Sequence, residues 1–153
     1  AHEGDEAGQD AVEKILAFSN LPAVKGRVIY LPAYNVASAE KLTRGADIWL
    51  NTPELGKEAC GTSGMKASLN GALQCSIRDG WVDEVSWEGR GWTLPVDNTV
   101  DVLYDILGHE ILPSFYDDPE GWTRRMKSSI ELIEEHYTAS RMLKDYEKKL
   151  YTW

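Results

Sequence analysis

The sequence predicts an α/β fold, in which a partial, Rossmann-like parallel sheet is followed by C-terminal helices. Three short apolar runs, at residues 27–31, 47–51 and 73–77, have the length and composition of buried strands. Stretches with apolar residues at helical spacing separate these runs, and the links are short. Alternation of strand and helix is typical of a parallel sheet with helices on its faces, and this half of the chain corresponds to half of a doubly wound domain.

Helices are predicted between these strands and throughout the C-terminal part. Ser38 is the expected N-cap of the second helix, and Asp118 followed by Pro119 marks the start of a later one. The predicted helices cover residues 9–19, 39–44, 62–70 and 98–107, a segment from 119 onward, and residues 140–151.

Residues 80–95 are predicted to form a compact loop, because Trp81, Trp87 and Trp92 lie there among Gly and acidic residues. We expect these tryptophans to pack in the interior and not to stack on sugar rings, since each can bury a large area. The chain is accordingly divided into a Rossmann-like half-domain, residues 1–95, and a helical segment, residues 96–153, packing on it.

The composition excludes several classes of function. The net charge is -9 and the pI about 4.8, so binding to nucleic acid or to an anionic membrane is not expected. No apolar run reaches the roughly 20 residues that a membrane helix needs, and no signal peptide is recognisable. The two cysteines, Cys60 and Cys75, are predicted to be reduced, buried thiols of a cytoplasmic protein.

The stretch Glu58–Gly71, EACGTSGMKASLNG, carries the clearest chemical signal. Small residues from Gly61 to Gly64 precede a predicted helix, and the amides at a helix N-terminus can bind a phosphate group. Lys66 follows in the same helix beside apolar residues, where a lysine amine can react with an aldehyde. Glu58 can accept hydrogen bonds from sugar hydroxyls. Alternatively, the turn is only a helix cap and Lys66 an ordinary surface residue.

Histidines give a weaker signal. His2, His109 and His136 lie far apart and lack the spacing of metal ligands, so no metal site is predicted. His109 and His136 are expected at the surface. The neighbouring Asp83 and Glu84 are not expected to act as an acid–base pair, since adjacent side chains point in different directions.

Several motifs resemble those of one family. The run EACGTSGMKASLNGAL resembles the pyridoxal-phosphate signature of the α-glucan phosphorylases, E-A-S-G-T-(G/S)-(N/G)-M-K followed by L-N-G-A-L. YLPAYNVASAEKLTRGAD, AHEGDEAGQ and IRDGWVDE also resemble family segments, and the C-terminal MLKDYEKKLY is consistent with them. The resemblance covers about residues 1–95 and implies half of the C-terminal domain of a two-Rossmann glycosyltransferase.

The resemblance implies a role for each matching residue. Lys66 corresponds to the lysine that forms the Schiff base with pyridoxal 5'-phosphate, and it is the implied catalytic residue. The implied cofactor-binding residues are Lys66, Gly61, Thr62, Ser63, Gly64 and Tyr34. The implied sugar-binding residues are Glu58, Ala59, Cys60 and Gly61. Cys60 stands where the family usually has Ser, and Asn35 where long phosphorylases often have Arg, so a charge near the cofactor is missing.

The implied reaction is transfer of a glucosyl unit between the end of an α-1,4-glucan and inorganic phosphate, with glucose 1-phosphate as product. The family's phosphate-binding Lys and Arg residues precede the segment present here. The chain alone is therefore expected to be inactive, and its expected partner is the N-terminal part of the same enzyme. It is expected to be cytoplasmic.

Two alternatives remain open from the sequence. One is a glycosyltransferase that uses a nucleotide sugar, although many such enzymes have two Glu residues separated by seven others, and here Lys66 holds the second position after Glu58. The other is a non-catalytic, self-associating fragment, because half of a doubly wound sheet exposes a strand edge. Homo-oligomers are possible in either case.

Overall fold

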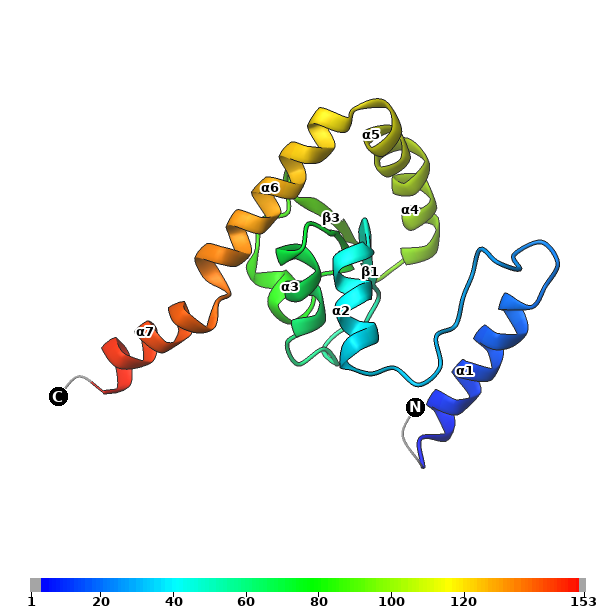
Figure 1. Ribbon diagram of the computed structural model, residues 1–153, viewed down its shortest axis with the longest axis horizontal. Helices are drawn as coiled ribbons and strands as arrows, with labels where there is room; N and C mark the ends of the chain where they lie inside the picture. Colours follow the sequence, from blue (N-terminus) through cyan, green and yellow to red (C-terminus); the bar gives the residue numbers. More distant parts are fainter. Residues whose placement is uncertain (1–3, 152–153) are drawn as a thin grey trace. The chain divides into compact units, whose positions relative to one another are not determined.

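The computed structural model describes residues 4–151 (Figure 1). This part of the chain divides into two compact units, with the boundary between Ser38 and Ala39. The first unit contains helix α1, Glu6–Ser19, whose N-cap Asp5 accepts a hydrogen bond from the Gly8 amide at 2.9 Å. Helix α2, Val36–Gly45, begins in the first unit and ends in the second.

The predicted strand at residues 27–31 is wrong. The chain turns twice before it, through hydrogen bonds from the Lys25 amide to the Leu21 carbonyl and from the Val28 amide to the Val24 carbonyl. Pairing is limited to an isolated bridge between Lys25 and Val28. An apolar run becomes a strand only where a neighbouring strand offers a ladder of donors and acceptors, and Ile29 is 70% exposed here.

Helix α2 starts earlier than predicted. The Ser38 amide donates to Asn35 Oδ1 at 3.1 Å, and the Asn35 amide donates to Ser38 Oγ at 2.8 Å. This reciprocal pair has the geometry of a capping box, with Asn35 as the cap and Ser38 three residues on. The prediction of Ser38 as the N-cap is therefore corrected to Asn35.

The sheet has three parallel strands in the order β1-β2-β3: Ile48–Asn51, Leu73–Ile77 and Gly91–Leu94. Helix α3, Thr62–Leu69, connects β1 to β2, and the 3-10 helix η1, Gly80–Glu84, follows β2. The α/β class and the parallel sheet are thus confirmed. Strand β3 corrects the prediction of a compact loop over residues 80–95.

Gly91 explains why β3 can pair so closely with β2. A Cβ atom at this position would lie 2.6 Å from the Gln74 carbonyl oxygen and 3.1 Å from the Trp87 ring. Only glycine allows the two backbones to approach in this way. Four residues with one glycine give little strand signal in the sequence, so tertiary packing decides this element.

Helices form the rest of the second unit, as predicted (Figure 1). The segment predicted as a helix at 98–107 continues as α4, Thr99–Ile106, a π-helical turn η2, Leu107–Ile111, and α5, Leu112–Asp117. Two further helices follow, α6, Pro119–His136, and α7, Ala139–Leu150. Asp118 caps α6 by accepting from the Gly121 amide at 2.8 Å, which confirms the predicted cap.

Two buried clusters hold the second unit together. One joins β2 and β3 to the helices through Leu73, Cys75, Ile77, Trp92, Leu94, Ile106, Ile111 and Trp122. The other contains Trp81, Val82, Val85, Trp87 and Ile133. Trp81, Trp87 and Trp92 are all buried, so their predicted packing role is confirmed. The predicted division at residue 95 stays a prediction.

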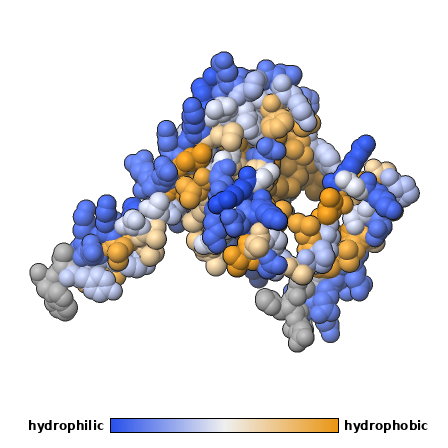
Figure 2. Space-filling model, in the orientation of Figure 1, coloured by the Kyte–Doolittle hydropathy of each residue, from blue (hydrophilic) through white to orange (hydrophobic). Residues whose placement is uncertain are grey.

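Helix α7 has no buried residue. Met142, Leu143, Tyr146 and Leu150 are 43–65% exposed, and apolar atoms lie among polar ones along this helix in Figure 2. Across residues 4–151, no helix is both long and apolar enough to span a membrane.

Candidate functional site

The stretch Glu58–Gly71 begins in the loop after β1 and continues through α3. Strands β1 and β2 are parallel, so the loop after β1 and the segment after β2 emerge at the same edge of the sheet. In open α/β sheets, ligands bind outside the carboxyl ends of the strands. The structure therefore places the predicted site at the edge where such sites form.

Gly61 is the residue that turns the loop into α3. It is the N-cap, with φ 85° and ψ 45°, a left-handed conformation that other residues adopt at a cost. Its carbonyl accepts from the Gly64 amide at 3.1 Å. Thr62 and Ser63 are exposed in the first turn, where helix amides have no partner within the helix.

A buried polar contact fixes α3 on the sheet. The side chain of Gln74, in β2, donates to the Gly64 carbonyl at 3.0 Å and to Ser68 Oγ at 2.9 Å. Gly64, Ala67 and Ser68 form the buried face of the helix. A Cβ atom at Gly64 would lie 2.9 Å from Gln74 Oε1, so this glycine is required by the packing below it.

Lys66 is exposed, on the part of α3 that does not face the sheet. It follows Thr62 by four residues and Ser63 by three, so the lysine amine shares a helix face with the first-turn residues. The amine and the phosphate-binding turn predicted from the sequence are thus accessible from one side. The assigned roles of Lys66, Gly61, Thr62, Ser63 and Gly64 stay predictions.

The loop before α3 is held by Asp79, a residue for which no role was predicted. Asp79 Oδ2 accepts from the Gly56 amide at 2.8 Å and from the Glu58 amide at 3.1 Å, and Oδ1 accepts from the Gly80 amide at 2.9 Å. Hydrogen bonds from Glu58 first, and from Gly80 and Gly56, hold the pKa of Asp79 below its ordinary value. The sequence signal for this role was an Asp-Gly pair, Asp79-Gly80, one residue beyond the predicted strand at 73–77.

The predicted sugar-contacting residues lie in this loop. Asn51, the last residue of β1, donates to Glu58 Oε2 at 3.4 Å. Ala59 and Cys60 are exposed, so the prediction that both cysteines are buried is wrong for Cys60. The backbone is nevertheless held here, because the Cys60 carbonyl accepts from the Trp81 amide at 3.2 Å.

Cys75 contrasts with Cys60. It is fully buried in β2, as predicted, and burial raises the pKa of its thiol to about 11. A buried neutral thiol is a poor nucleophile, so Cys75 is a packing residue.

Trp81 supports the turn from below. A Cβ atom at Gly61 would lie 3.3 Å from Trp81 Cδ1, and one at Gly64 would lie 3.4 Å from Trp81 Cζ2. The Trp81 ring meets Trp87 and Tyr137 edge to face, with centroids 5.2 Å apart in each pair. The turn before α3 therefore rests on an aromatic layer.

Other predicted residues lie apart from this arrangement. Tyr34 belongs to the first unit and is 63% exposed, and its role stays a prediction. His2 lies outside the described residues. His109 and His136 are exposed, as predicted. His109 of η2 lies beside the Asp105 carboxylate of α4, and His136 lies beside the Glu135 carboxylate of α6.

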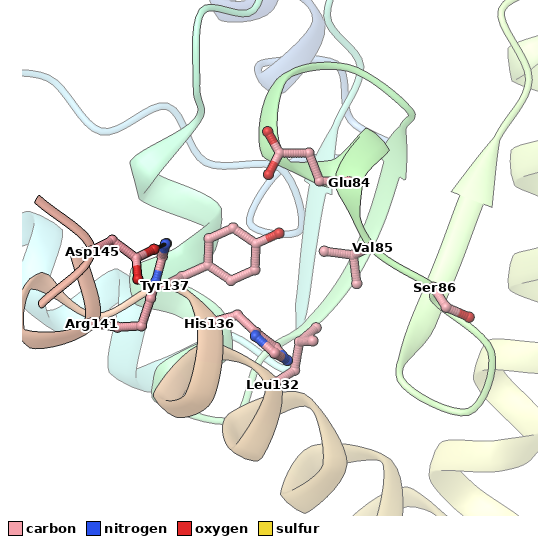
Figure 3. Close-up of a pocket in the computed structure, with 8 residues that line it drawn as sticks. All are labelled: Glu84, Val85, Ser86, Leu132, His136, Tyr137, Arg141 and Asp145. Carbon is pink, nitrogen blue, oxygen red and sulfur yellow. Dashed lines mark hydrogen bonds and ion pairs between the residues drawn. The ribbon is translucent and has the colours of Figure 1, made fainter. Parts of the chain in front are cut away.

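A cavity of about 500 Å³ lies at the corner between α6 and α7 (Figure 3). Its lining residues are Glu84, Val85, Ser86, Leu132, His136, Tyr137, Arg141 and Asp145. Burial, with the Glu84 carboxylate adding to it, raises the pKa of Tyr137, whose hydroxyl points towards the segment of Glu84 and Val85 in Figure 3. None of the predicted site residues lines this cavity.

The ion pair beside the cavity joins two residues of α7. Arg141 Nη1 lies 2.7 Å from Asp145 Oδ2, and this hydrogen bond, with Lys149 nearby, holds the pKa of Asp145 below its ordinary value. The two residues are four positions apart, which is about one helical turn, so the ion pair stabilises α7 locally.

Comparison with known proteins identifies similar sequences. The family model described as carbohydrate phosphorylase matches residues 16–88. A glycogen phosphorylase of Mycobacterium tuberculosis is 36% identical over 99% of this chain and 19% of its own length. A maltodextrin phosphorylase of Thermococcus litoralis is 37% identical over 99% of this chain and 20% of its own. A glycogen phosphorylase of Aquifex aeolicus is 37% identical over 99% of this chain and 24% of its own length. The chain spans about a fifth to a quarter of these relatives.

Proposed function

Because the chain belongs to the α-glucan phosphorylase family, we propose that it forms the cofactor-bearing part of such an enzyme. The proposed reaction transfers glucosyl units between the end of an α-1,4-glucan and inorganic phosphate. The names of the relatives, glycogen and maltodextrin phosphorylase, support this substrate class. The proposed architecture is half of a Rossmann-like domain of a two-domain glycosyltransferase.

The observation that carries the proposal is the position of EACGTSGMKASLNG. This stretch lies after the first of two parallel strands and leads into α3. Its exposed lysine, Lys66, shares a helix face with Thr62 at the helix start. An amine and a cluster of helix N-terminal amides on one accessible face suit an aldehyde with an anionic group.

The residues present fit pyridoxal 5'-phosphate. Lys66 would hold its aldehyde carbon, and the first-turn amides of Thr62 and Ser63 would face its phosphate, with the positive end of α3 favouring the negative charge. Gly64, whose amide donates to the Gly61 carbonyl, would close the turn around that phosphate. Tyr34 is the proposed tyrosine near the cofactor. When bound, the cofactor supplies a phosphate group that can exchange a proton with the substrate phosphate.

The loop residues would receive the sugar. Glu58 presents a carboxylate that accepts hydrogen bonds from hydroxyl groups, and Asn51 supports it from the end of β1. Cys60 is exposed beside it, and a thiol is a weaker hydrogen-bonding group than a hydroxyl. Substrate recognition at this position therefore relies on Glu58 and on backbone groups of Ala59 and Gly61.

We further propose that the chain alone does not turn over substrate and that it works with the N-terminal part of the same enzyme. The chain spans about a fifth of the relatives, and orientation of two phosphates and a sugar needs groups from several segments. A cytoplasmic location is part of the proposal, and the two free cysteines are consistent with a reducing compartment.

The experiment that tests the cofactor role is covalent trapping. The chain is incubated with pyridoxal phosphate, reduced with borohydride and mapped by mass spectrometry. We expect adducts on Lys66 in preference to Lys57, an exposed lysine of the preceding loop that serves as the matched control. Equal labelling of both lysines would contradict the proposal.

A second measurement distinguishes the alternative donor. Thermal unfolding is followed with pyridoxal phosphate, UDP-glucose and ADP-glucose in parallel. We expect stabilisation by pyridoxal phosphate and none by the nucleotide sugars, because only a ligand that binds the folded chain raises its melting temperature. Stabilisation by a nucleotide sugar alone would favour a nucleotide-sugar-dependent transferase.

A further inference from the structure

The Asp79 carboxylate joins two segments that are distant in sequence. It accepts from its own neighbour Gly80 at 2.9 Å, and from Gly56 at 2.8 Å and Glu58 at 3.1 Å, which lie 23 and 21 residues earlier. An ionised carboxylate makes shorter and stronger hydrogen bonds with amides than a neutral acceptor does. The end of β2 thus holds the loop that follows β1.

A second connection lies beside the first. The Trp81 amide donates to the Cys60 carbonyl at 3.2 Å. Gly80 has φ 55°, and a Cβ atom there would lie 2.8 Å from the Cys60 carbonyl oxygen and 3.2 Å from Glu58 Cγ. The two segments are therefore in direct backbone contact. Asp79 holds Gly56 and Glu58 at one end of the loop, and the Trp81 amide holds Cys60 at the other.

Capping alone does not account for this arrangement. Asp79 is the N-cap of η1, and the hydrogen bond from Gly80 serves that purpose. The bonds from Gly56 and Glu58 go to a different segment and are not needed for a cap. They determine instead where the Glu58 backbone lies, and hence where its side chain meets Asn51.

We propose that Asp79 is a positioning residue, which holds residues 56–60 so that Glu58 and the turn at Gly61 face a ligand bound before α3. The inference rests on the proposed function, because the ligand is the one proposed there. Asp79 acts through the loop and does not itself touch the ligand.

Three variants separate positioning from capping. Asp79→Ser keeps a good N-cap for Gly80 but is too short to reach both Gly56 and Glu58. Asp79→Asn keeps the shape, removes the charge and replaces one of the two accepting oxygens by a donor. Asp83→Asn is the matched control, since Asp83 is an exposed neighbour that pairs with Arg78 at 3.0 Å and not with the loop.

The first readout is the amide spectrum of the nitrogen-15-labelled chain. In Asp79→Ser and Asp79→Asn we expect the Gly56 and Glu58 amide protons to move upfield and to exchange faster, while Asp83→Asn leaves both unchanged. Unaltered Gly56 and Glu58 signals in Asp79→Ser would overturn the proposal. This readout does not depend on any ligand.

The second readout is the concentration of pyridoxal phosphate that half-saturates borohydride-trapped labelling of Lys66. In Asp79→Ser we expect it to rise about tenfold, with the same labelling at saturation, because a loop without the charge-assisted hydrogen bonds of Asp79 occupies its ligand-binding position less of the time. Urea unfolding must show that each variant is almost wholly folded without denaturant. A change in the half-saturating concentration then cannot come from a loss of folded chain.

The outcomes distinguish the two proposals. Wild-type behaviour of Asp79→Ser in the labelling assay shows that Asp79 is only a cap and overturns the inference. Absence of Lys66 labelling in the wild-type chain contradicts the proposed function, and the positioning role falls with it. In that case the amide spectrum still decides whether Asp79 holds the loop.

Discussion

Helices α1 and α3 show how differently local and tertiary forces stabilise two parts of this chain. Helix α1 has 14 residues and a side-chain cap at Asp5, and it buries none of its residues. Helix α3 spans only Thr62–Leu69 and has no side-chain cap hydrogen bond. It nevertheless buries Gly64, Ala67 and Ser68 against the sheet and is held by Gln74.

The comparison indicates that the candidate site depends on tertiary contacts and not on helix propensity. Isolated helices shorter than about 12–15 residues are marginal in water, so a helix of eight residues such as α3 requires its packing. The packing fixes the turn at Gly61 and the helix face of Lys66 together. Changes below the site should therefore disturb it more than changes in α1.

The largest expected effect is at the central strand. Leu73→Ala removes a side chain that is fully buried in the main cluster, and we expect the free energy of unfolding to fall by about 2–5 kcal/mol. Urea unfolding measures it. Leu16→Ala in α1, where the side chain is 40% exposed, is the control and should change stability by less than about 1 kcal/mol. Equal losses would contradict the contrast between the exposed helix α1 and the packed sheet that supports α3.

A smaller loss is expected at the start of α3. Gly61→Ala places a side chain at φ 85°, which costs about 1–2 kcal/mol, and its Cβ meets Trp81. Gly45→Ala at the end of α2 is the matched control, because a Cβ there meets nothing within 4 Å. Denaturant unfolding of both variants tests the prediction, and a Gly61→Ala chain as stable as the Gly45→Ala chain would refute it.

The cap of α1 gives a local effect. Asp5→Ala removes the acceptor of the Gly8 amide and should destabilise α1 by about 1 kcal/mol. Amide hydrogen exchange should rise in α1 while exchange in β2 stays as in the wild type. Faster exchange in β2 would show that α1 supports the sheet after all.

The Asp79 carboxylate makes the site region sensitive to acid. Its pKa in the folded chain lies below the ordinary value of 3.8, so the ionised form stabilises the fold. That stabilisation is complete well above the ordinary value and is lost as the pH falls through the lower, folded value. The difference in unfolding free energy between wild type and Asp79→Asn should therefore be constant at neutral pH and shrink in acid. A difference that does not change with pH would contradict the assignment.

Thiol reactivity sharpens the comparison without changing stability. Ellman's reagent should modify Cys60 in the folded chain, because this residue is exposed in the loop. Cys75 should react only after unfolding, since it is buried and its pKa is raised to about 11. The Cys60→Ser variant, the control, should show almost no reaction until urea is added, and rapid reaction of this variant when folded would contradict the burial of Cys75.

Much of the fold could be predicted from the sequence. The cap at Asp118 with Pro119 after it located the start of α6, and the apolar runs located β1 and β2. The run at 27–31 is at least as apolar as these two, but it makes only an isolated bridge. An apolar composition allows a segment to form a strand. Whether it does so depends on a neighbouring strand with which its backbone can form hydrogen bonds.

For the candidate site, the sequence indicated the groups but not their support. The motif with Gly61 and Lys66 was recognisable because its residue types and spacing are local. Asp79 was not assigned a role, and Trp81 was expected only to pack in the interior, because their contacts with Gly56, Glu58 and Cys60 cross more than 20 positions. Such contacts leave no periodicity in the sequence.

The sequence by itself determined the α/β class, the family, the turn before α3 and the placement of a lysine one helical turn beyond it. The family follows from the resemblance of the motifs, whereas the turn and the lysine follow from local spacing, since the helix repeat sets which residues share a face. Only the tertiary structure decided that β3 pairs with β2 at Gly91, that Cys60 is exposed, and that Asp79 holds the loop of Glu58. Each of these features depends on contacts between two segments that are distant in sequence. The free energy of such contacts depends on both segments, so neither segment predicts it alone.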